Sequence, residues 1–513
     1  MELTREQIAA VAEQKRDAYE AVIGLEVHVQ LKTATKIFCG CSTRFGDPPN
    51  TNVCPVCLGL PGALPVLNRQ AVELAVRAAL ALNLRVNPRS RFARKNYFYP
   101  DLPKGYQISQ YDQPLSADGW LEIEIPISSP SPVAPSSRAK SSDAAGKKRI
   151  GITRLHLEED AGKSLHEGFP DSDRNTYLDF NRCGVPLIEI VGEPDLRSAE
   201  EAYSYLTTLK QILEYIEVSD CDMEKGSLRC DANVSVRPRG ADTFGVKTEV
   251  KNLNSFRYLA RALEYETHRQ IALLENGGRI EQETRLWNLP AGRTEPMRSK
   301  EYAHDYRYFP EPDLLPLEVD SAWQETIRRT MPELPVTKTA RFVRDYGITA
   351  YDAEVLTATR ALADYFESVA RAVPNAKTAA NWIQSELLAT LKERSKDITE
   401  SPVSPTALAE LVQLVGEGTL SGKMGKTVFQ KMVESGRGAR EIIAAEKMEQ
   451  ITDAAAIEKL CRAVLEKNSD KVAQYKKGKT ALFGFFVGQV MKASRGQANP
   501  RQVNTALKKL LGG

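Results

Sequence analysis

The sequence lacks the long apolar segments of membrane proteins, because no run approaches the roughly 18 residues needed to cross a bilayer. It also begins with charged residues where a secretory signal would have an apolar core. Cysteine is scarce, with eight among 513 residues, and four of these are scattered singly, unlike the disulfide framework of a small secreted protein. We therefore expect a soluble, cytoplasmic protein that binds no membrane.

Acidic residues are missing from Lys471 to Gly513, although the whole chain is nearly balanced, with 69 Lys and Arg against 67 Asp and Glu. This end carries nine Lys and Arg, and a purely basic end of a balanced chain predicts a polyanionic partner. Helical spacing from Ala481 to Met491 leaves one apolar face for packing. The cations expected to stay free for phosphates are Lys476, Lys477, Lys479, Lys492 and Arg495.

The other four cysteines form two close pairs, in the order Cys39-x-Cys41-x12-Cys54-x2-Cys57. Each short spacing holds two thiolates close together. The intervening loop brings the two pairs of thiolates together, as a tetrahedral zinc ion requires. Because thiolates fill all four positions, the ion would fold a loop at residues 37–60 and leave no place for a catalytic water. The alternatives are small buried cysteines or two disulfides.

Two polar residues of opposite chemistry share one face of an expected strand at residues 23–31. Period-two geometry places Glu26 and His28 on the same side, opposite Val27 and Val29. A carboxylate and an imidazole held two residues apart on a rigid strand can share a divalent ion or a phosphate-bearing substrate.

Other strand patterns in the same part of the chain also carry charged residues at alternate positions. Arg229 and Asp231 share one face, as do Glu249 and Lys251, and three acids at residues 158–160 end another strand. Each face taken singly is more often a solvated surface. Their concentration in one region, however, suits a hard divalent cation such as Mg²⁺ together with substrate phosphates.

The periodicity of the chain changes at about Pro332. Strand-like alternation with three helical segments precedes that point and predicts a mixed α/β domain with a large, mainly antiparallel sheet. The later windows are helical, so the predicted fold class is α+β with an all-α second half. We expect an N-terminal extension at 1–18, a sheet domain at 19–330 with a disordered insertion at 128–148, a helical domain at 331–445 and a small all-α tail domain at 446–513.

Residues 97–111 are dense in aromatic residues and in Pro and Gly, which favours an ordered loop over a helix or strand. Such a loop either stacks on a base or packs as a structural element, and the residues alone favour neither. Residues 422–427 resemble a phosphate-binding loop. That loop needs four residues between its glycines and a preceding strand, whereas this segment has two and follows a helix, so we expect no nucleotide there.

Long motifs of the chain resemble those of one family, the B subunits (GatB) of the aspartyl/glutamyl-tRNA amidotransferases. The resemblance runs from about Tyr19 to the C-terminus, interrupted mainly by the insertion at 128–148. The motifs that carry it lie at residues 23–28, 94–101, 106–110, 157–163, 226–233, 251–256, 305–313 and 487–500.

This resemblance implies a two-step reaction on a misacylated tRNA. ATP would phosphorylate the side-chain carboxylate of Glu on tRNA(Gln) or of Asp on tRNA(Asn), and ammonia would then displace the phosphate to give the amide. The family holds this site in a cradle-shaped sheet domain, followed by a helical domain and a tRNA-binding tail. Because the chain shows no Cys–His or Ser-based glutaminase pattern, the implied nitrogen source is glutamine hydrolysed by the amidase A subunit, with a small C subunit completing a heterotrimer.

The resemblance also assigns roles to residues. Glu159 is favoured over Glu158 by that similarity, since strand alternation cannot choose between them. Positive charge must offset the repulsion between a carboxylate and ATP, and the candidates for this phosphate-binding role are Lys95, Lys104, Arg229 and Lys251. The implied cofactors are ATP, Mg²⁺ and a structural Zn²⁺, which only some family members carry. The catalytic and Mg²⁺-binding set is Glu26, His28, Glu159, Asp231 and Glu249.

Two other classes of function remain open from the sequence. A non-catalytic, zinc-bearing RNA-binding scaffold would explain the cysteines and the basic end, yet would leave the acids unused. A metal-dependent nuclease or phosphatase would explain the acids, but the chain has no familiar hydrolase metal motif. Hydrolysis of ATP stimulated by a charged tRNA separates the three. The choice between Glu-tRNA(Gln) and Asp-tRNA(Asn) depends on the synthetases of the organism.

Overall fold

The computed structural model describes residues 4–125, 146–166, 168–297, 306–446, 448, 451, 453–494 and 497–512. The chain divides into two compact units, Met1–Leu334 and Pro335–Gly513. Most of the insertion expected at 128–148 lies outside the described residues. Its last three residues are described and begin strand β7 (Gly146–Glu159).

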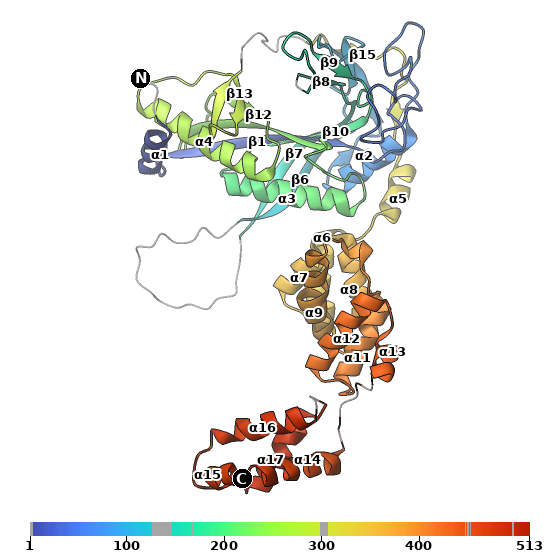
Figure 1. Cartoon of the computed structure of the whole chain (residues 1–513). Coiled ribbons are helices and arrows are strands. Elements are labelled where there is room, and N and C mark those ends of the chain that lie inside the picture. Colours follow the sequence, from blue (N-terminus) through green and yellow to red (C-terminus); the bar gives the residue numbers. More distant parts are fainter. Residues whose placement is uncertain are drawn as a thin grey trace. The chain divides into compact units, whose positions relative to one another are not determined.

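The first unit contains a nine-stranded sheet (Figure 1). Strands β12 and β13 pair in parallel, and the other neighbours in this sheet pair antiparallel. The long central strands come from distant parts of the chain. Their pairing brings side chains from these parts next to one another across the sheet. The spatial order is β14 (Arg293–Pro296), β13 (Thr284–Asn288), β12 (Thr248–Lys251), β11 (Leu228–Pro238), β1 (Tyr19–Gln30), β10 (Pro186–Gly192), β7 (Gly146–Glu159), β6 (Ser116–Ile125) and β2 (Arg85–Val86).

Alternation along β1 explains why this sheet has one apolar and one polar face. Val27 and Val29 are fully buried, whereas Glu26 and His28, which alternate with them, are half-buried. Burying one valine fully stabilises the fold by roughly 1.5–3 kcal/mol, so the pattern fixes which face meets the core. Residues of three helices complete that core: α2 (Arg69–Ala81), α3 (Ala199–Tyr215) and α4 (Phe256–Glu275).

Each of these three helices begins at a side chain that caps its first turn. Asn68, Ser198 and Ser255 accept hydrogen bonds from backbone N–H groups of α2, α3 and α4. Asn and Ser satisfy N–H groups that have no partner within the helix, so the sequence specifies where each helix starts. The other helices of this unit are α1 (Arg5–Gln14) and α5 (Ser321–Thr330).

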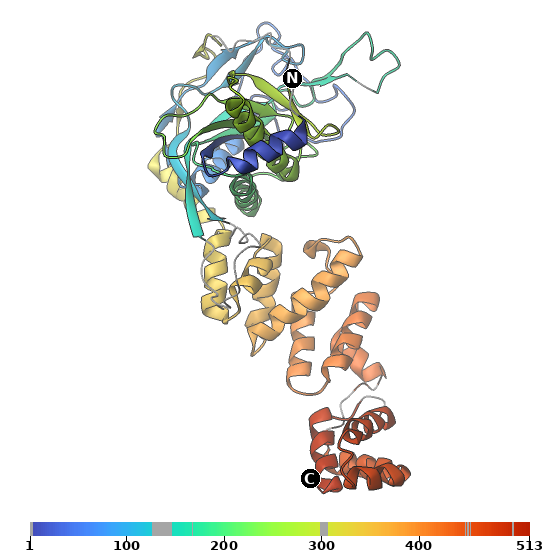
Figure 2. The same ribbon diagram turned by 90° about the vertical axis from the view of Figure 1, so that its left-hand side faces the viewer.

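The expected N-terminal extension contains helix α1, which packs along α4 (Figure 2). Ala12 of α1 and Ile271 of α4 are buried in one small apolar cluster. Three smaller sheets complete the unit: β15 (Phe309–Pro310) with β4 (Ala93–Asn96) and β5 (Tyr106–Ser109), β16 (Leu317–Glu318) with β3 (Arg89–Ser90), and β8 (Lys163–Leu165) with β9 (Tyr177–Asp179).

The second unit is helical throughout its described residues. Gly422 begins a helix, so the segment at 422–427 has no strand–loop geometry for a phosphate. The elements are α6 (Pro335–Tyr346), α7 (Ala350–Leu356), α8 (Arg360–Ala372), α9 (Ala376–Trp382), a π-helical turn (Ile383–Leu387), α10 (Leu388–Glu393), a 3₁₀ turn (Ile398–Glu400), α11 (Pro405–Gly416), α12 (Gly422–Ser435), α13 (Ala439–Glu446), α14 (Ala454–Lys467), α15 (Ser469–Lys476), α16 (Leu482–Ala493) and α17 (Pro500–Leu511).

The predicted fold class is confirmed: a mixed, mainly antiparallel sheet is followed by helices. The further division of the helical half at about residue 445 stays a prediction. Helices α14, α16 and α17 do share an apolar core of their own, with Cys461, Phe486 and Leu507 at its centre. Within the described residues, no helix is long and apolar enough to cross a membrane.

Candidate active site

Polar side chains from five neighbouring strands gather on the face of the large sheet that the core helices do not cover. Pairing places Glu26 opposite Asp231 and His28 opposite Glu189, although these residues are far apart in the sequence. We call this group the acid strip. Its members are Glu249 and Lys251 of β12, Asp231 of β11, Glu26 and His28 of β1, Glu189 of β10, and His156 and Glu158 of β7.

Glu189 lies at the centre of the strip, between two histidines. Its Oε2 atom is 3.4 Å from Nε2 of His28 and 3.4 Å from Nε2 of His156. His28 is also 3.5 Å from Oε1 of Glu26 and 3.9 Å from Oε1 of Glu158. Two sets could each hold a metal ion, since their ligand atoms lie within 4.8 Å of one another: Glu26, His28 and Glu189, and His156, Glu158 and Glu189.

Burial and the charges of neighbouring side chains determine the pKa values of the acids and histidines in the strip. Burial and the Glu189 carboxylate raise the pKa of Glu26, because neither favours a further negative charge. Burial lowers the pKa of His156, but the carboxylates of Glu189 and Glu158 outweigh it and raise that pKa to about 9. The same attraction from the two histidines keeps the pKa of Glu189 low despite its burial. The strip therefore combines ionised carboxylates with positive charge in a partly dehydrated site.

The four cationic candidates occupy three places. Nζ of Lys251 lies 3.1 Å from Asp231 Oδ2 and 3.3 Å from Glu249 Oε1, so it belongs to the strip. Burial opposes the charge of Lys95, yet the carboxylates of Glu158 and Glu189 in the strip outweigh it and raise the pKa of Lys95. Arg229 instead pairs with Asp160 at 2.9 Å, and Lys104 pairs with Glu159.

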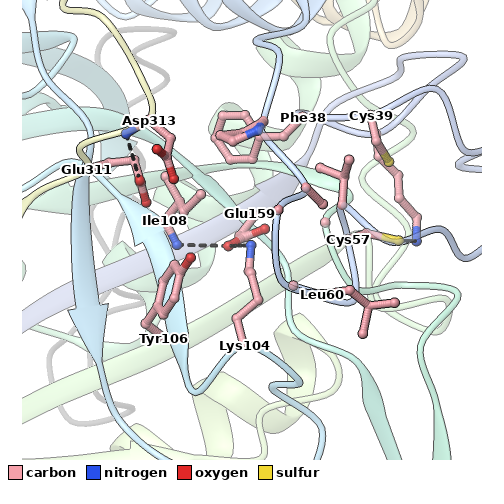
Figure 3. Close-up of a pocket in the computed structure, with 17 residues that line it drawn as sticks. Phe38, Cys39, Cys57, Leu60, Lys104, Tyr106, Ile108, Glu159, Glu311 and Asp313 are labelled. Carbon is pink, nitrogen blue, oxygen red and sulfur yellow. Dashed lines mark hydrogen bonds and ion pairs between the residues drawn. The ribbon is translucent and has the colours of Figure 1, made fainter.

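Glu159 lies outside the acid strip, and its role as a metal ligand together with His28 stays a prediction. Its carboxylate binds Lys104 and accepts a hydrogen bond of 2.8 Å from the backbone N–H of Ile108 (Figure 3). Neighbouring residues of a strand point to opposite sides, so only one of the two acids can reach His28. The one that does is Glu158, whose second oxygen accepts from Ser109 at 2.9 Å.

Glu189 and His156 were not among the residues predicted from the sequence. Glu189 is the single charged residue in the apolar stretch 187–191, and a lone acid inside a buried strand was the available signal. His156 is likewise flanked by Leu155 and Leu157 and is 3% exposed. Which strands become neighbours, and so which charges meet, could not be derived from alternation within each strand.

The four cysteines of the expected zinc loop converge, with their sulfur atoms within 4.8 Å of one another. This donor set is compatible with structural zinc. The neighbouring Cys39 thiol, the backbone N–H of Cys54 and the Lys36 ammonium outweigh burial and lower the pKa of Cys57 to about 4. Lys36 is fully buried, donates to Cys57 Sγ at 3.6 Å, and makes no carboxylate ion pair within the described residues.

A pocket of about 190 Å³ separates the zinc loop from the Lys104–Glu159 pair (Figure 3). Phe38, Leu60 and Cys57 line it from the loop, and Glu311 lines it from the segment around β15. The acids of this pocket have cationic partners, since Glu159 binds Lys104 within the lining and Glu311 binds Arg94 outside it at 2.8 Å.

Lys476, Lys477, Lys479 and Lys492 are exposed and make no ion pair with any described residue. The fifth expected cation of this group, Arg495, lies outside the described residues. The helix expected at 481–491 is present as α16 and buries Phe486 and Val490.

Comparison with known proteins accounts for nearly the whole chain. Residues 21–325 match the GatB/GatE catalytic domain, and residues 364–511 match the GatB domain. The B subunit of the aspartyl/glutamyl-tRNA(Asn/Gln) amidotransferase of Moorella thermoacetica is 56% identical over 494 residues, which cover 96% of this chain and 100% of the relative. The corresponding protein of Carboxydothermus hydrogenoformans is 55% identical, with 96% and 98% covered. The chain belongs to the family of aspartyl/glutamyl-tRNA(Asn/Gln) amidotransferase B subunits.

Proposed function

We propose that this chain carries the site at which a tRNA-bound Glu or Asp side chain is phosphorylated by ATP and then converted to the amide. The observation that carries this proposal is the acid strip, with Lys95 and Lys251 beside it, in a chain so similar to the B subunits. Glu-tRNA(Gln) and Asp-tRNA(Asn) are the proposed substrates, and the reaction class is a carbon–nitrogen ligase with glutamine as amide donor.

Three groups of the strip are suited to hold Mg²⁺: Glu26, His28 and Glu189, whose ligand atoms lie close together. When bound, the ion would offset the charge of the phosphates. Asp231 and Glu249 extend the site by fixing Lys251 between them at 3.1 and 3.3 Å. Lys251 and Lys95 would then face two anions, the substrate carboxylate and ATP, whose mutual repulsion otherwise opposes reaction.

The nitrogen for the second step is proposed to come from partner chains. The sequence has no glutaminase motif, so an amidase A subunit would release ammonia, and a C subunit would complete a heterotrimer. Zinc on Cys39, Cys41, Cys54 and Cys57 would support the fold of its loop. The exposed lysines of the tail are proposed to bind the tRNA backbone, since they have no competing carboxylate among the described residues.

Hydrolysis of ATP that depends on charged tRNA tests the proposal. Asp231→Asn or Glu249→Gln should lower this rate about 100-fold, because removing one preorganised electrostatic group typically costs that much. The control is Asp118→Asn, an exposed carboxylate on β6 that pairs with Arg85 away from the strip. Wild-type rates in both strip variants, or no tRNA-stimulated hydrolysis in the unmodified protein, would refute the proposal and favour an RNA-binding scaffold.

A further inference from the structure

Five tyrosines from three separate segments form one aromatic cluster. Tyr97 and Tyr99 follow β4, and Tyr111 follows β5. Tyr306 and Tyr308 precede β15. Tyr111 and Tyr308 stack face to face, with ring centroids 4.1 Å apart and planes 7° apart. Tyr306 then meets Tyr308 and Tyr97 edge to face, at 5.9 and 5.8 Å.

This cluster lies beside the acid strip. Lys95 Nζ is 4.9 Å from the centre of the Tyr306 ring and 5.8 Å from that of Tyr97. Burial raises the pKa of Tyr308 to about 12, with the negative charges of Glu158 and Glu189 adding to that rise. Lys95 lies over the Tyr306 ring, and the negative charge of Glu158 in the strip raises its pKa.

One ring of the cluster leaves a face open. Tyr111 is 58% exposed, and its one ring partner within the described residues is Tyr308, which covers a single face. Its hydroxyl makes no hydrogen bond to any described residue. Tyr111 therefore offers an uncovered aromatic face, backed by the parallel ring of Tyr308.

We propose that the open face of Tyr111, backed by Tyr308, binds an adenine base by stacking. A planar base extends an existing stack of rings at parallel spacing, as stacking sites for single-stranded nucleic acids do. The nearby Lys95 suits the phosphates that accompany such a base. The inference rests on the proposed function, whose two substrates, ATP and the 3′ end of tRNA, both carry adenosine.

Two ligand pairs that differ in the adenine test this site and tell its sources apart. The first pair is Mg·ATP and Mg·tripolyphosphate, which carry the same phosphates with and without the base. The second pair is uncharged tRNA with and without its 3′-terminal adenosine. Affinities would be measured by titration of the full-length chain, as the unmodified protein and as Tyr111→Ala, Tyr308→Ala and Tyr111→Phe.

Loss of a stacking ring should weaken adenine-bearing ligands about 5- to 150-fold. Tyr111→Ala should therefore lower the affinity for ATP, or for tRNA with its terminal adenosine, while the matching ligand without adenine binds as before. Tyr111→Phe keeps the ring and should bind like the unmodified protein. The control is Phe244→Ala, an exposed aromatic residue (61%) in the turn after β11.

The outcomes separate the site from the proposed function. If Tyr111→Ala loses affinity for ATP alone, the stacked base is the adenine of ATP. If it loses affinity for tRNA alone, the stacked base is the 3′-terminal adenosine. If Tyr111→Ala and Tyr308→Ala bind all four ligands like the unmodified protein, or lose the ligands with and without adenine equally, the stacking site is refuted and the proposed function stands. Failure of the unmodified protein to bind either ATP or tRNA would instead refute both.

Discussion

At the scale of single residues, Lys36 is a buried charge immediately before the zinc loop. Its ammonium is fully buried and donates to the carbonyls of Asn52 and Phe180, at 2.7 and 3.3 Å, as well as to Cys57. A buried cation without a counter-charge is costly. Since no described carboxylate pairs with it, a thiolate at Cys57 is the available counter-charge, and thiolates at such a cluster are the form that binds metal.

We expect about one zinc ion per purified chain, and its retention should depend on this charge. Cys54→Ser should lose the ion because three thiolates remain. Lys36→Met should keep the four thiolates but weaken zinc binding about 10- to 100-fold, the usual cost of removing a group that orients a ligand. Metal analysis and chelator competition measure both effects. Full zinc content in Cys54→Ser, or a loss of equal size in the control Cys461→Ser, a cysteine of the second unit, would contradict the assignment.

Glu158 and Glu159 form a matched pair of tests, because they are adjacent but contact different partners. Glu158→Gln should lower tRNA-dependent ATP hydrolysis about 100-fold, since it removes a charge beside His28 and His156. Glu159→Gln should retain that activity within a few fold but lower stability by about 3–5 kcal/mol, because it leaves the buried ammonium of Lys104 unpaired. The rate of ATP hydrolysis and the denaturant midpoint are measured for both variants. If Glu159→Gln loses activity and Glu158→Gln retains it, Glu159 belongs to the active site instead.

At the scale of elements, local periodicity predicted strands and helices better than it predicted their neighbours. The alternation around Glu26 and His28 depends on nearby residues, so the sequence alone predicted it. The position of β10 beside β1 depends on packing between segments more than 150 residues apart, which no local pattern encodes. For that reason the sequence analysis did not identify Glu189, the central residue of the site, even though a lone acid in a short apolar strand was a visible signal.

Helix α8 offers an electrostatic test within the second unit. Glu367 is 8% exposed and accepts from Arg341 at 2.8 Å and from Arg371 at 2.7 Å. Burial alone would raise the pKa of Glu367, but Arg341 and then Arg371 and Lys338 outweigh it and lower that pKa. A carboxyl with a depressed pKa in the folded state adds stability above its unfolded pKa, about 4.5, and loses it as pH falls through the folded value.

Glu367→Gln should therefore destabilise the protein by about 1–3 kcal/mol at pH 7, because charged donors lose their partner. The difference from the unmodified protein should shrink below about pH 4.5. Thermal unfolding followed between pH 3 and 8 measures this dependence. Glu393→Gln, an exposed glutamate on α10, should show no such change. A constant difference at every pH would show that Glu367 acts through packing instead of charge.

At the scale of the whole molecule, charge is distributed unevenly in a way that fits two separate tasks. Carboxylates and histidines concentrate on the sheet of the first unit, whereas residues 471–513 have no acid at all. The tail helices α14, α16 and α17 bury their own apolar core, so their fold does not depend on the basic side chains. Those side chains are left exposed at Lys476, Lys477 and Lys479.

Truncation after about Ala445 should consequently weaken tRNA binding severalfold or more and raise the KM for charged tRNA, with zinc content unchanged. If the tail neutralises several phosphates, the logarithm of affinity must fall steeply with the logarithm of salt concentration. Each contact removed should flatten that slope by a little under one unit, so alanine at Lys476, Lys477 and Lys479 together should act as a partial truncation. The binding should follow the RNA backbone more than its sequence, since the free groups are exposed point charges at the end of α15 and just after it. Titrations at several salt concentrations measure both affinity and slope; equal values for the full-length and truncated chains would exclude the tail as a tRNA-binding element.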